Sequence, residues 1–180
     1  NPGNYIDKRA NFKELNLSDY EYNLELEKIH DRLLPLIKVC REYGTAIRIG
    51  SNHGSLSDRI LSRYGNTARG MVEAAMEFIS IFGAENFHNL VISMKASNVK
   101  VMTESCELLT QRMIETGYVY PQHLGVTEAG AGNDARIKSC LGIAYLLNKG
   151  IGDTIRVSLT ENPVNEITFA KKFMSAFGEK

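Results

Sequence analysis

The chain has 180 residues, of which 43% are apolar and 23% charged, an ordinary composition for one globular domain with a sizeable core. Its 21 basic and 21 acidic side chains balance, so no overall positive field attracts nucleic acid, and any anion site must be local. No apolar run approaches the ~20 residues that cross a bilayer. We therefore expect neither nucleic acid nor a membrane as a partner.

The three cysteines, Cys40, Cys106 and Cys140, are odd in number and far apart in the sequence. None forms a C-x-x-C pair, and each falls among apolar residues at helical spacing. This pattern is typical of free, structural thiols in a reducing compartment. It predicts no metal site in this chain.

The first elements are a turn and a long helix. Asn1-Pro2-Gly3-Asn4 reads as a turn, which normally follows another element, so we expect the chain to have been cut from a longer protein just after a strand. Residues 5–20 show no clear periodicity. Ser18 with Glu21 has the pattern of a capping box, and apolar residues then recur at helical spacing until Gly44.

Strand-like runs and helical stretches alternate through the rest of the chain. Strict alternation predicts parallel βαβ units. A closed (βα)8 barrel needs eight strands, so four strands predict half of such a barrel or a small open sheet. The expected strands cover residues 45–50, 89–95, 122–128 and 154–159, and the expected helices cover 56–63, 67–82, 97–116, 134–148 and a stretch that begins at Pro163.

Each of the four strand-like runs carries a charged side chain. Successive side chains point to opposite faces of a strand, and these charged residues alternate with apolar ones. The carboxyl ends of barrel strands form the rim of the active site, so the pattern predicts a mostly cationic site that suits a diphosphate. The residues concerned are Arg48, Lys95, Glu128 and Arg156, with Ser158 on the same strand face as Arg156.

Taken singly, each charged residue leaves alternatives open. Arg48, with Asn52 and His53 in the following loop, fits either an anion clamp or an ordinary salt bridge. Lys95, which precedes a helix start at Ser97, fits anion binding, a solvated strand end or, more distantly, Schiff-base chemistry. Glu128 fits a general acid or base, or a charge favoured by a helix N-terminus.

Five motifs carry a resemblance to a known family. The chain resembles the bacterial and plastid 4-hydroxy-3-methylbut-2-enyl diphosphate synthases from Asn1 to about residue 177, with the motifs in the same order. The motifs are NPGN at 1–4, IRIGSNHGSL at 47–56, SMKAS at 93–97, HLGVTEAG at 123–130 and GIGDTIRVSL at 150–159.

The resemblance implies an oxidoreductase of the non-mevalonate isoprenoid pathway. Such enzymes reductively open and dehydrate 2-C-methyl-D-erythritol 2,4-cyclodiphosphate to the linear allylic diphosphate. Their TIM-barrel domain holds the substrate diphosphate, and a separate domain holds a [4Fe-4S] cluster on three cysteines and a glutamate. The resemblance also implies ferredoxin or flavodoxin as electron donor, a homodimer, and a location in the bacterial cytoplasm or plastid stroma.

Carried over motif by motif, the resemblance assigns two kinds of site residue. Thr127 and Glu128 are expected to be catalytic, with the glutamate acting in protonation or on a substrate hydroxyl. The expected substrate-binding residues are Arg48, Asn52, Lys95, Arg156, Ser158 and, at the rim, Asn4.

We therefore expect residues 1–180 to be a partial TIM-barrel domain, βα units five to eight, without the first barrel half and without the iron-sulfur domain. Such a fragment is expected to bind the diphosphate but to be inactive alone. The alternatives are another phosphate-binding barrel of pterin-synthase or aldolase type, or a non-catalytic anion-binding half-barrel.

Overall fold

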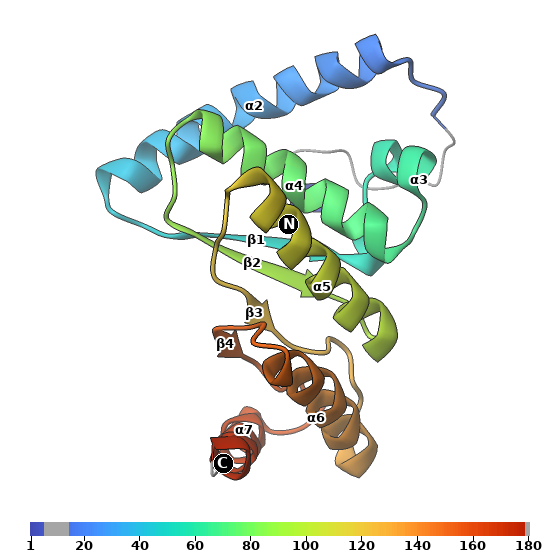
Figure 1. Cartoon of the computed structure of the whole chain (residues 1–180), viewed down its shortest axis with the longest axis vertical. Coiled ribbons are helices and arrows are strands. Elements are labelled where there is room, and N and C mark those ends of the chain that lie inside the picture. The colour runs from blue at the N-terminus through green and yellow to red at the C-terminus, as the bar shows by residue number, and fades with distance from the viewer. Residues whose placement is uncertain (6–14, 179–180) are drawn as a thin grey trace.

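Helices and short strands alternate along the chain in the computed structural model, which describes residues 1–5 and 15–178 (Figure 1). The strands are β1 (Ile47–Asn52), β2 (Leu90–Lys95), β3 (His123–Leu124) and β4 (Thr154–Ile155). The helices are α1 (Pro2–Tyr5), α2 (Asp19–Glu42), α3 (Asp58–Tyr64), α4 (Ala68–Ala84), α5 (Val99–Thr116), α6 (Gly132–Asn148) and α7 (Pro163–Gly178), with a 3-10 turn, η1, at His53–Ser55.

The strands lie side by side in chain order and run parallel. β1 pairs with β2 over its whole length, from Ile47 opposite Leu90 to Asn52 opposite Lys95. β3 pairs with β4 in the same sense, and an isolated parallel bridge between Ile92 and the residue before β3 joins the two pairs. The prediction of alternating βα units on parallel strands, as in part of a TIM barrel, is confirmed.

The last two strands are shorter than the sequence predicts. Beyond Leu124, the neighbouring segments are joined by single backbone hydrogen bonds, such as Arg156 N to Leu124 O at 2.8 Å and Thr127 N to Ala96 O at 3.1 Å. Glu128 adopts a left-handed backbone with φ of 52°, which ends the extended conformation. The predicted strand at 122–128 is therefore wrong over its second half.

Helix starts follow local capping chemistry, with one correction. Ser18 Oγ accepts from Glu21 N at 3.3 Å, and the Glu21 carboxylate accepts from Ser18 N at 2.8 Å, which confirms the capping box. The cap of α5 is Asn98 and not Ser97, since Asn98 Oδ1 accepts from Val101 N at 3.2 Å.

The predicted opening turn is a single turn of helix, α1. Asn4 N donates to Asn1 O at 3.1 Å, and this helix packs against the end of β1. Most of the stretch for which no periodicity was found, residues 6–14, lies outside the described residues.

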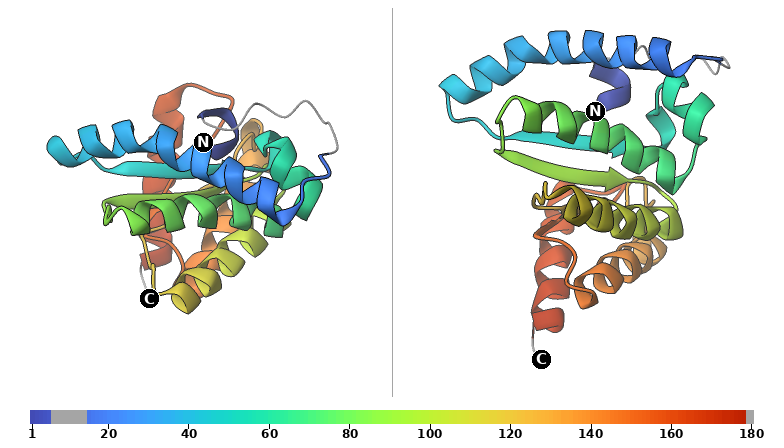
Figure 2. Two further views of the ribbon diagram at one scale, coloured as in Figure 1. Left: turned by 90° about the horizontal axis from the view of Figure 1, so that it is seen from above. Right: turned by 45° about the horizontal axis from the view of Figure 1, so that its top comes forward.

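The core lies between the sheet and the helices that follow each strand. Figure 2 shows α2, α4, α5 and α6 arranged in succession along the sheet. Ile49, Ile92 and Met94 point from the strands into this layer and are at most 3% exposed. Full burial of such a side chain stabilises the fold by about 1.5–3 kcal/mol. Because these residues alternate with polar ones, the opposite sheet face carries the predicted site residues.

Candidate functional site

A hollow of about 70 Å³ lies on the polar face of the sheet, where β2, β3 and β4 end. We call it the rim hollow. Four of the predicted site residues line it, namely Lys95, Thr127, Arg156 and Ser158, together with Ser93, His123, Gly125 and Val126. The carboxyl ends of parallel strands meet at one edge of a sheet, and ligands of βα folds bind at that edge.

Lys95 extends across the neighbouring strand. Its Cε and Nζ lie 3.4 Å from the point that a Cβ at Gly50 would occupy, so the absence of a side chain at Gly50 leaves the lysine its path over β1. Burial lowers the pKa of Lys95, and the positive charges of Arg48 and Arg156 lower it further. The ammonium group is therefore held near two like charges.

Carboxylates do little to neutralise these cations. Within residues 1–5 and 15–178, neither Arg48 nor Lys95 forms an ion pair. Arg156 lies 3.5 Å from the Glu166 carboxylate, with its own side chain 64% exposed. A pair this long and exposed contributes little. The hollow therefore concentrates positive charge that carboxylates only partly neutralise.

Arg48 lies at the margin of the rim hollow and does not line it. Its side chain is exposed and borders a separate, mainly apolar cavity of about 170 Å³ between α2, α4 and β1. Its charge nonetheless acts on Lys95 and on His123 across the sheet face. The salt-bridge alternative for Arg48 has no partner among the described residues.

Besides Arg48, three predicted site residues do not line the rim hollow. Glu128 is exposed in the turn after β3, and Asn4 is exposed on α1. Asn52 is half-buried, and its Oδ1 accepts from Gly54 N at 3.1 Å, which caps the turn η1. The structure thus places Glu128 just beyond the hollow and gives Asn52 a local structural contact.

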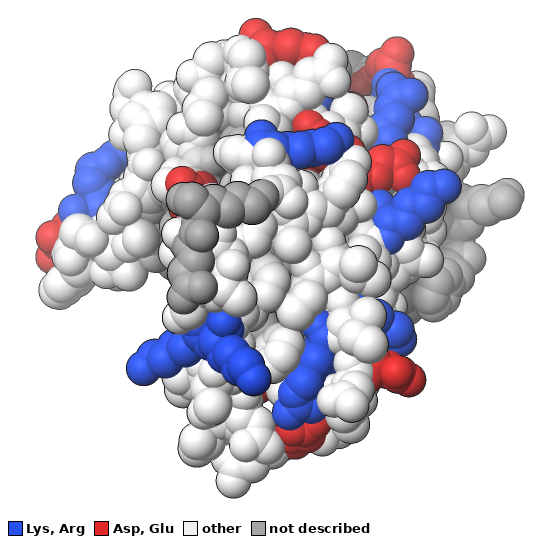
Figure 3. All heavy atoms as spheres, turned by 60° about the horizontal axis from the view of Figure 1, so that its bottom comes forward, with Lys and Arg blue, Asp and Glu red and all other residues white. Residues whose placement is uncertain are grey.

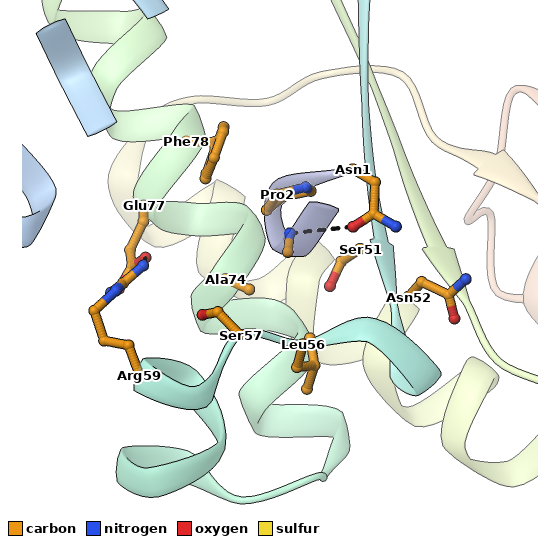
Figure 4. Close-up of a pocket in the computed structure, with 11 residues that line it drawn as sticks. Asn1, Pro2, Ser51, Asn52, Leu56, Ser57, Arg59, Ala74, Glu77 and Phe78 are labelled. Carbon is orange, nitrogen blue, oxygen red and sulfur yellow. Dashed lines mark hydrogen bonds and ion pairs between the residues drawn. The ribbon is translucent and has the colours of Figure 1, made fainter. Parts of the chain in front are cut away.

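The segment around Asn52 is closely packed against the first helix (Figure 4). Asn1 Nδ2 donates to Ser55 Oγ at 2.9 Å, and the backbone of Gly3 lies so close to Ser55 O that a Cβ there would come within 1.8 Å. The enclosed space holds no water-sized volume. In the described structure this region is packing and not a ligand pocket.

Two polar side chains of the rim hollow, those of His123 and Ser93, are not among the predicted site residues. His123 Nδ1 lies 2.8 Å from Thr154 Oγ1, and burial, followed by the charges of Arg48, Lys95 and Arg156, lowers the pKa of its imidazole. Ser93 is 1% exposed, and its Oγ has no hydrogen-bond partner. Both could have been found by extending the strand alternation from Lys95 back to Ser93 and from Thr127 back to His123.

The cysteines do not suit a metal cluster. Cys40 and Cys106 are buried on α2 and α5, while Cys140 is half-buried on α6, and all three are free. Burial raises the pKa of the Cys106 thiol to about 12, whereas cluster ligands are thiolates. Residues 1–5 and 15–178 contain no group of three or more His, Cys, Asp or Glu side chains that could hold a metal ion.

Charged side chains of both signs lie on the face of the molecule that Figure 3 shows. On the face shown in Figure 3, basic and acidic side chains are mixed and separated by wide uncharged areas. None of the described helices is both long and apolar enough to cross a bilayer.

A parallel βα sheet with a polar hollow at the carboxyl ends of its strands defines the chain as part of a TIM barrel. Residues 1–171 match the family described as the GcpE TIM-barrel domain. The chain belongs to this family, and the resemblance seen in its motifs is confirmed.

Curated relatives carry one common name, 4-hydroxy-3-methylbut-2-en-1-yl diphosphate synthase (flavodoxin). The relative from Bacteroides thetaiotaomicron is 58% identical over 174 residues, which are 97% of this chain and 28% of the relative. Those from Parabacteroides distasonis and Leptospira interrogans are 54% and 52% identical over 180 residues, 30% and 27% of their lengths. The chain thus spans less than a third of these relatives.

Proposed function

We propose that this chain forms the diphosphate-binding part of a 4-hydroxy-3-methylbut-2-en-1-yl diphosphate synthase. The observation that carries the proposal is the positive charge that Lys95 and Arg156 bring to the rim hollow, with Arg48 at its margin, where only Arg156 has a carboxylate partner among the described residues. Family membership and the printed names of the relatives support the choice of substrate over other anions. They also favour it over a pterin-synthase-like or aldolase-like barrel.

In the proposed complex, the diphosphate lies against the rim hollow of the sheet. The Arg156 guanidinium and the Lys95 ammonium bind its oxygens through charge-assisted hydrogen bonds, since these are the strong contacts available to phosphate groups. Thr127 and Ser158, which line the same hollow, donate their hydroxyls to the ligand. Glu128, in the turn just beyond, exchanges a proton with the carbon skeleton or its hydroxyl groups.

The proposed reaction of the complete enzyme is the reductive opening and dehydration of 2-C-methyl-D-erythritol 2,4-cyclodiphosphate. Flavodoxin, which the relatives' names print, or ferredoxin would supply the electrons. The [4Fe-4S] cluster implied by the family does not fit the cysteines of this chain, so we assign it no ligand here. The complete enzyme is proposed to be a homodimer and to be located in the bacterial cytoplasm or the plastid stroma.

Removing a guanidinium from the site tests the proposal. Arg156→Ala and Arg48→Ala should each weaken binding of the cyclic diphosphate by about 1.5–3 kcal/mol, or roughly 10- to 150-fold, because each loses a charged hydrogen bond. Isothermal titration calorimetry at low and moderate salt measures the affinity, and added salt should weaken it.

Arg41→Ala is the matched control, because Arg41 is an exposed arginine at the C-terminal end of α2, where its guanidinium contacts the Glu85 carbonyl. Unchanged affinity in both site variants would contradict the proposed clamp. If the unaltered chain shows no saturable binding of the cyclic diphosphate, it does not form a complete binding site by itself.

A further inference from the structure

Two polar side chains that line the rim hollow beside its cations, those of Ser93 and His123, do not belong to the set of residues that the resemblance assigns. Ser93 lies on β2, two residues before Lys95, and His123 begins β3. Both line the hollow. A buried hydroxyl without a hydrogen-bond partner is uncommon in folded proteins, and one that lines a hollow is free to donate to a ligand there. The Ser93 Oγ is such a group.

The His123 ring is held in one orientation by the neighbouring strand. Its Nδ1 lies 2.8 Å from Thr154 Oγ1, on the residue paired with it in the β3–β4 register. Its Nε2 has no hydrogen-bond partner among residues 1–5 and 15–178. An imidazole that is anchored through one nitrogen presents the other to a ligand.

The charges that face His123 come from three strands. Arg48 on β1, Lys95 on β2 and Arg156 just after β4 all act on the ring, and all three are positive. The nearby Asp153 carboxylate accepts from Gln122 N at 2.7 Å and is absent from the charges that shift His123. The empty site therefore disfavours the imidazolium form.

We propose that Ser93 and His123 are further anion-binding residues of the rim hollow, and that His123 takes up a proton from solvent when a diphosphate enters. The inference rests on the proposed function and extends it. A diphosphate brings at least two negative charges among the cations and so reverses the sign of the field at the ring. The imidazolium can then donate Nε2–H to one phosphate oxygen, and the Ser93 hydroxyl can donate to another.

Proton uptake gives the site a specific pH dependence. The pKa of His123 lies below its ordinary value in the empty site, as burial and the three cations require, and rises in the complex. Between these two pKa values, binding takes up one proton. His123 therefore strengthens diphosphate binding fully at pH values below the lower of its two pKa values. Between the two pKa values, the affinity declines by up to tenfold for each unit of rising pH.

The titration of the ring itself tests this inference. Proton NMR of the imidazole Cε1–H signals, recorded against pH with and without inorganic pyrophosphate, reports on all four histidines of the chain. A His123→Gln variant assigns the signal. We expect the pKa of His123 to rise by one unit or more with pyrophosphate, while the signal of the control His30, which lies on α2 and does not line the hollow, is unaffected by pyrophosphate.

The outcomes separate this inference from the proposal on which it rests. Saturable pyrophosphate binding with an unchanged His123 titration overturns the proton uptake and leaves the proposed function standing. No pyrophosphate binding by calorimetry overturns both. Because the ring is observed directly, the titration of pyrophosphate itself does not obscure the result.

Ser93→Ala tests the second donor. We expect this variant to bind pyrophosphate 3- to 10-fold more weakly, because one neutral hydrogen bond is lost. Ser139→Ala is the matched control, since Ser139 on α6 is equally buried, also lacks an Oγ partner and does not line the hollow. Equal affinity in the unaltered chain and Ser93→Ala, with both variants folded by circular dichroism, would remove Ser93 from the site.

Discussion

Glu128→Gln is expected to lower turnover of a complete enzyme that carries this segment about 10²- to 10⁴-fold, the range for loss of a general acid or base. Glutamine keeps the size of the side chain but cannot exchange a proton. Glu128 lies outside the rim hollow and is exposed, so affinity for the cyclic diphosphate should stay within about twofold. Steady-state turnover with reduced flavodoxin and calorimetric affinity measure the two effects separately.

The backbone at Glu128 supports a functional role for this position. Its φ of 52° lies in the left-handed region, which costs a residue with a side chain roughly 1–2 kcal/mol. Glycines stand nearby, at 130 and 132, yet the strained position carries a carboxylate. Strain of this kind is typical of functional turns.

Glu161→Gln is the control for the turnover experiment. Glu161 is a second carboxylate near the same turn, and both its oxygens are engaged by Arg136 at 2.7 Å. The hydrogen bonds from Arg136 and from Gly132 N lower the pKa of Glu161 to about 2, which makes it a poor proton donor at neutral pH. Its loss should leave turnover near the unaltered level. Full turnover in Glu128→Gln would contradict the proposed proton transfer. Glu128 would then act only through its negative charge, near the start of α6.

Glu77→Ala should lower the free energy of unfolding by about 3–5 kcal/mol, because it removes the carboxylate that binds a buried guanidinium through two hydrogen bonds. Arg59 on α3 binds both oxygens of Glu77 on α4 at 2.7 Å, and their side chains are only 4% and 12% exposed. Figure 4 shows the two side chains pointing toward each other between their helices. The Tyr22 hydroxyl from α2 also donates to Glu77.

This buried pair matters for the site because it ties together three helices that pack behind β1. Arg59 also lies over the Tyr22 ring, 4.5 Å from its centroid. Urea unfolding measures the loss, and Glu73→Ala is the matched control on the same helix. Glu73 faces the half-exposed Arg112 at 3.7 Å, so its removal should cost under about 1 kcal/mol. Equal losses of unfolding free energy in Glu77→Ala and Glu73→Ala would show that the buried ion pair stabilises the fold no more than the exposed one.

Local sequence signals predicted the elements well where the deciding contacts are local. The capping box at Ser18 involves residues three apart, so the pattern itself contains the interaction. The cap of α5 was misplaced by one residue, because Ser97 and Asn98 are both good caps and only the backbone path selects Asn98.

Strand ends were less predictable, because strand pairing depends on residues far apart in the chain. The runs at 122–128 and 154–159 have strand-like alternation throughout, yet regular pairing covers only His123–Leu124 and Thr154–Ile155. Gly125 lies so close to Arg156 O that a Cβ there would come within 2.6 Å. This close approach is invisible without the neighbouring strand.

Patterns along the chain were enough to predict the order of the βα units, the alternation that puts Lys95 and Arg156 on a polar face, and the family. Which polar side chains converge became known from the folded structure. It brought Ser93 and His123 into the rim hollow and left Asn4 outside it, with Asn52 bonded to its own turn. The reason is physical: the face of a side chain follows from its neighbours along one strand, whereas convergence depends on the register between strands about thirty to forty residues apart.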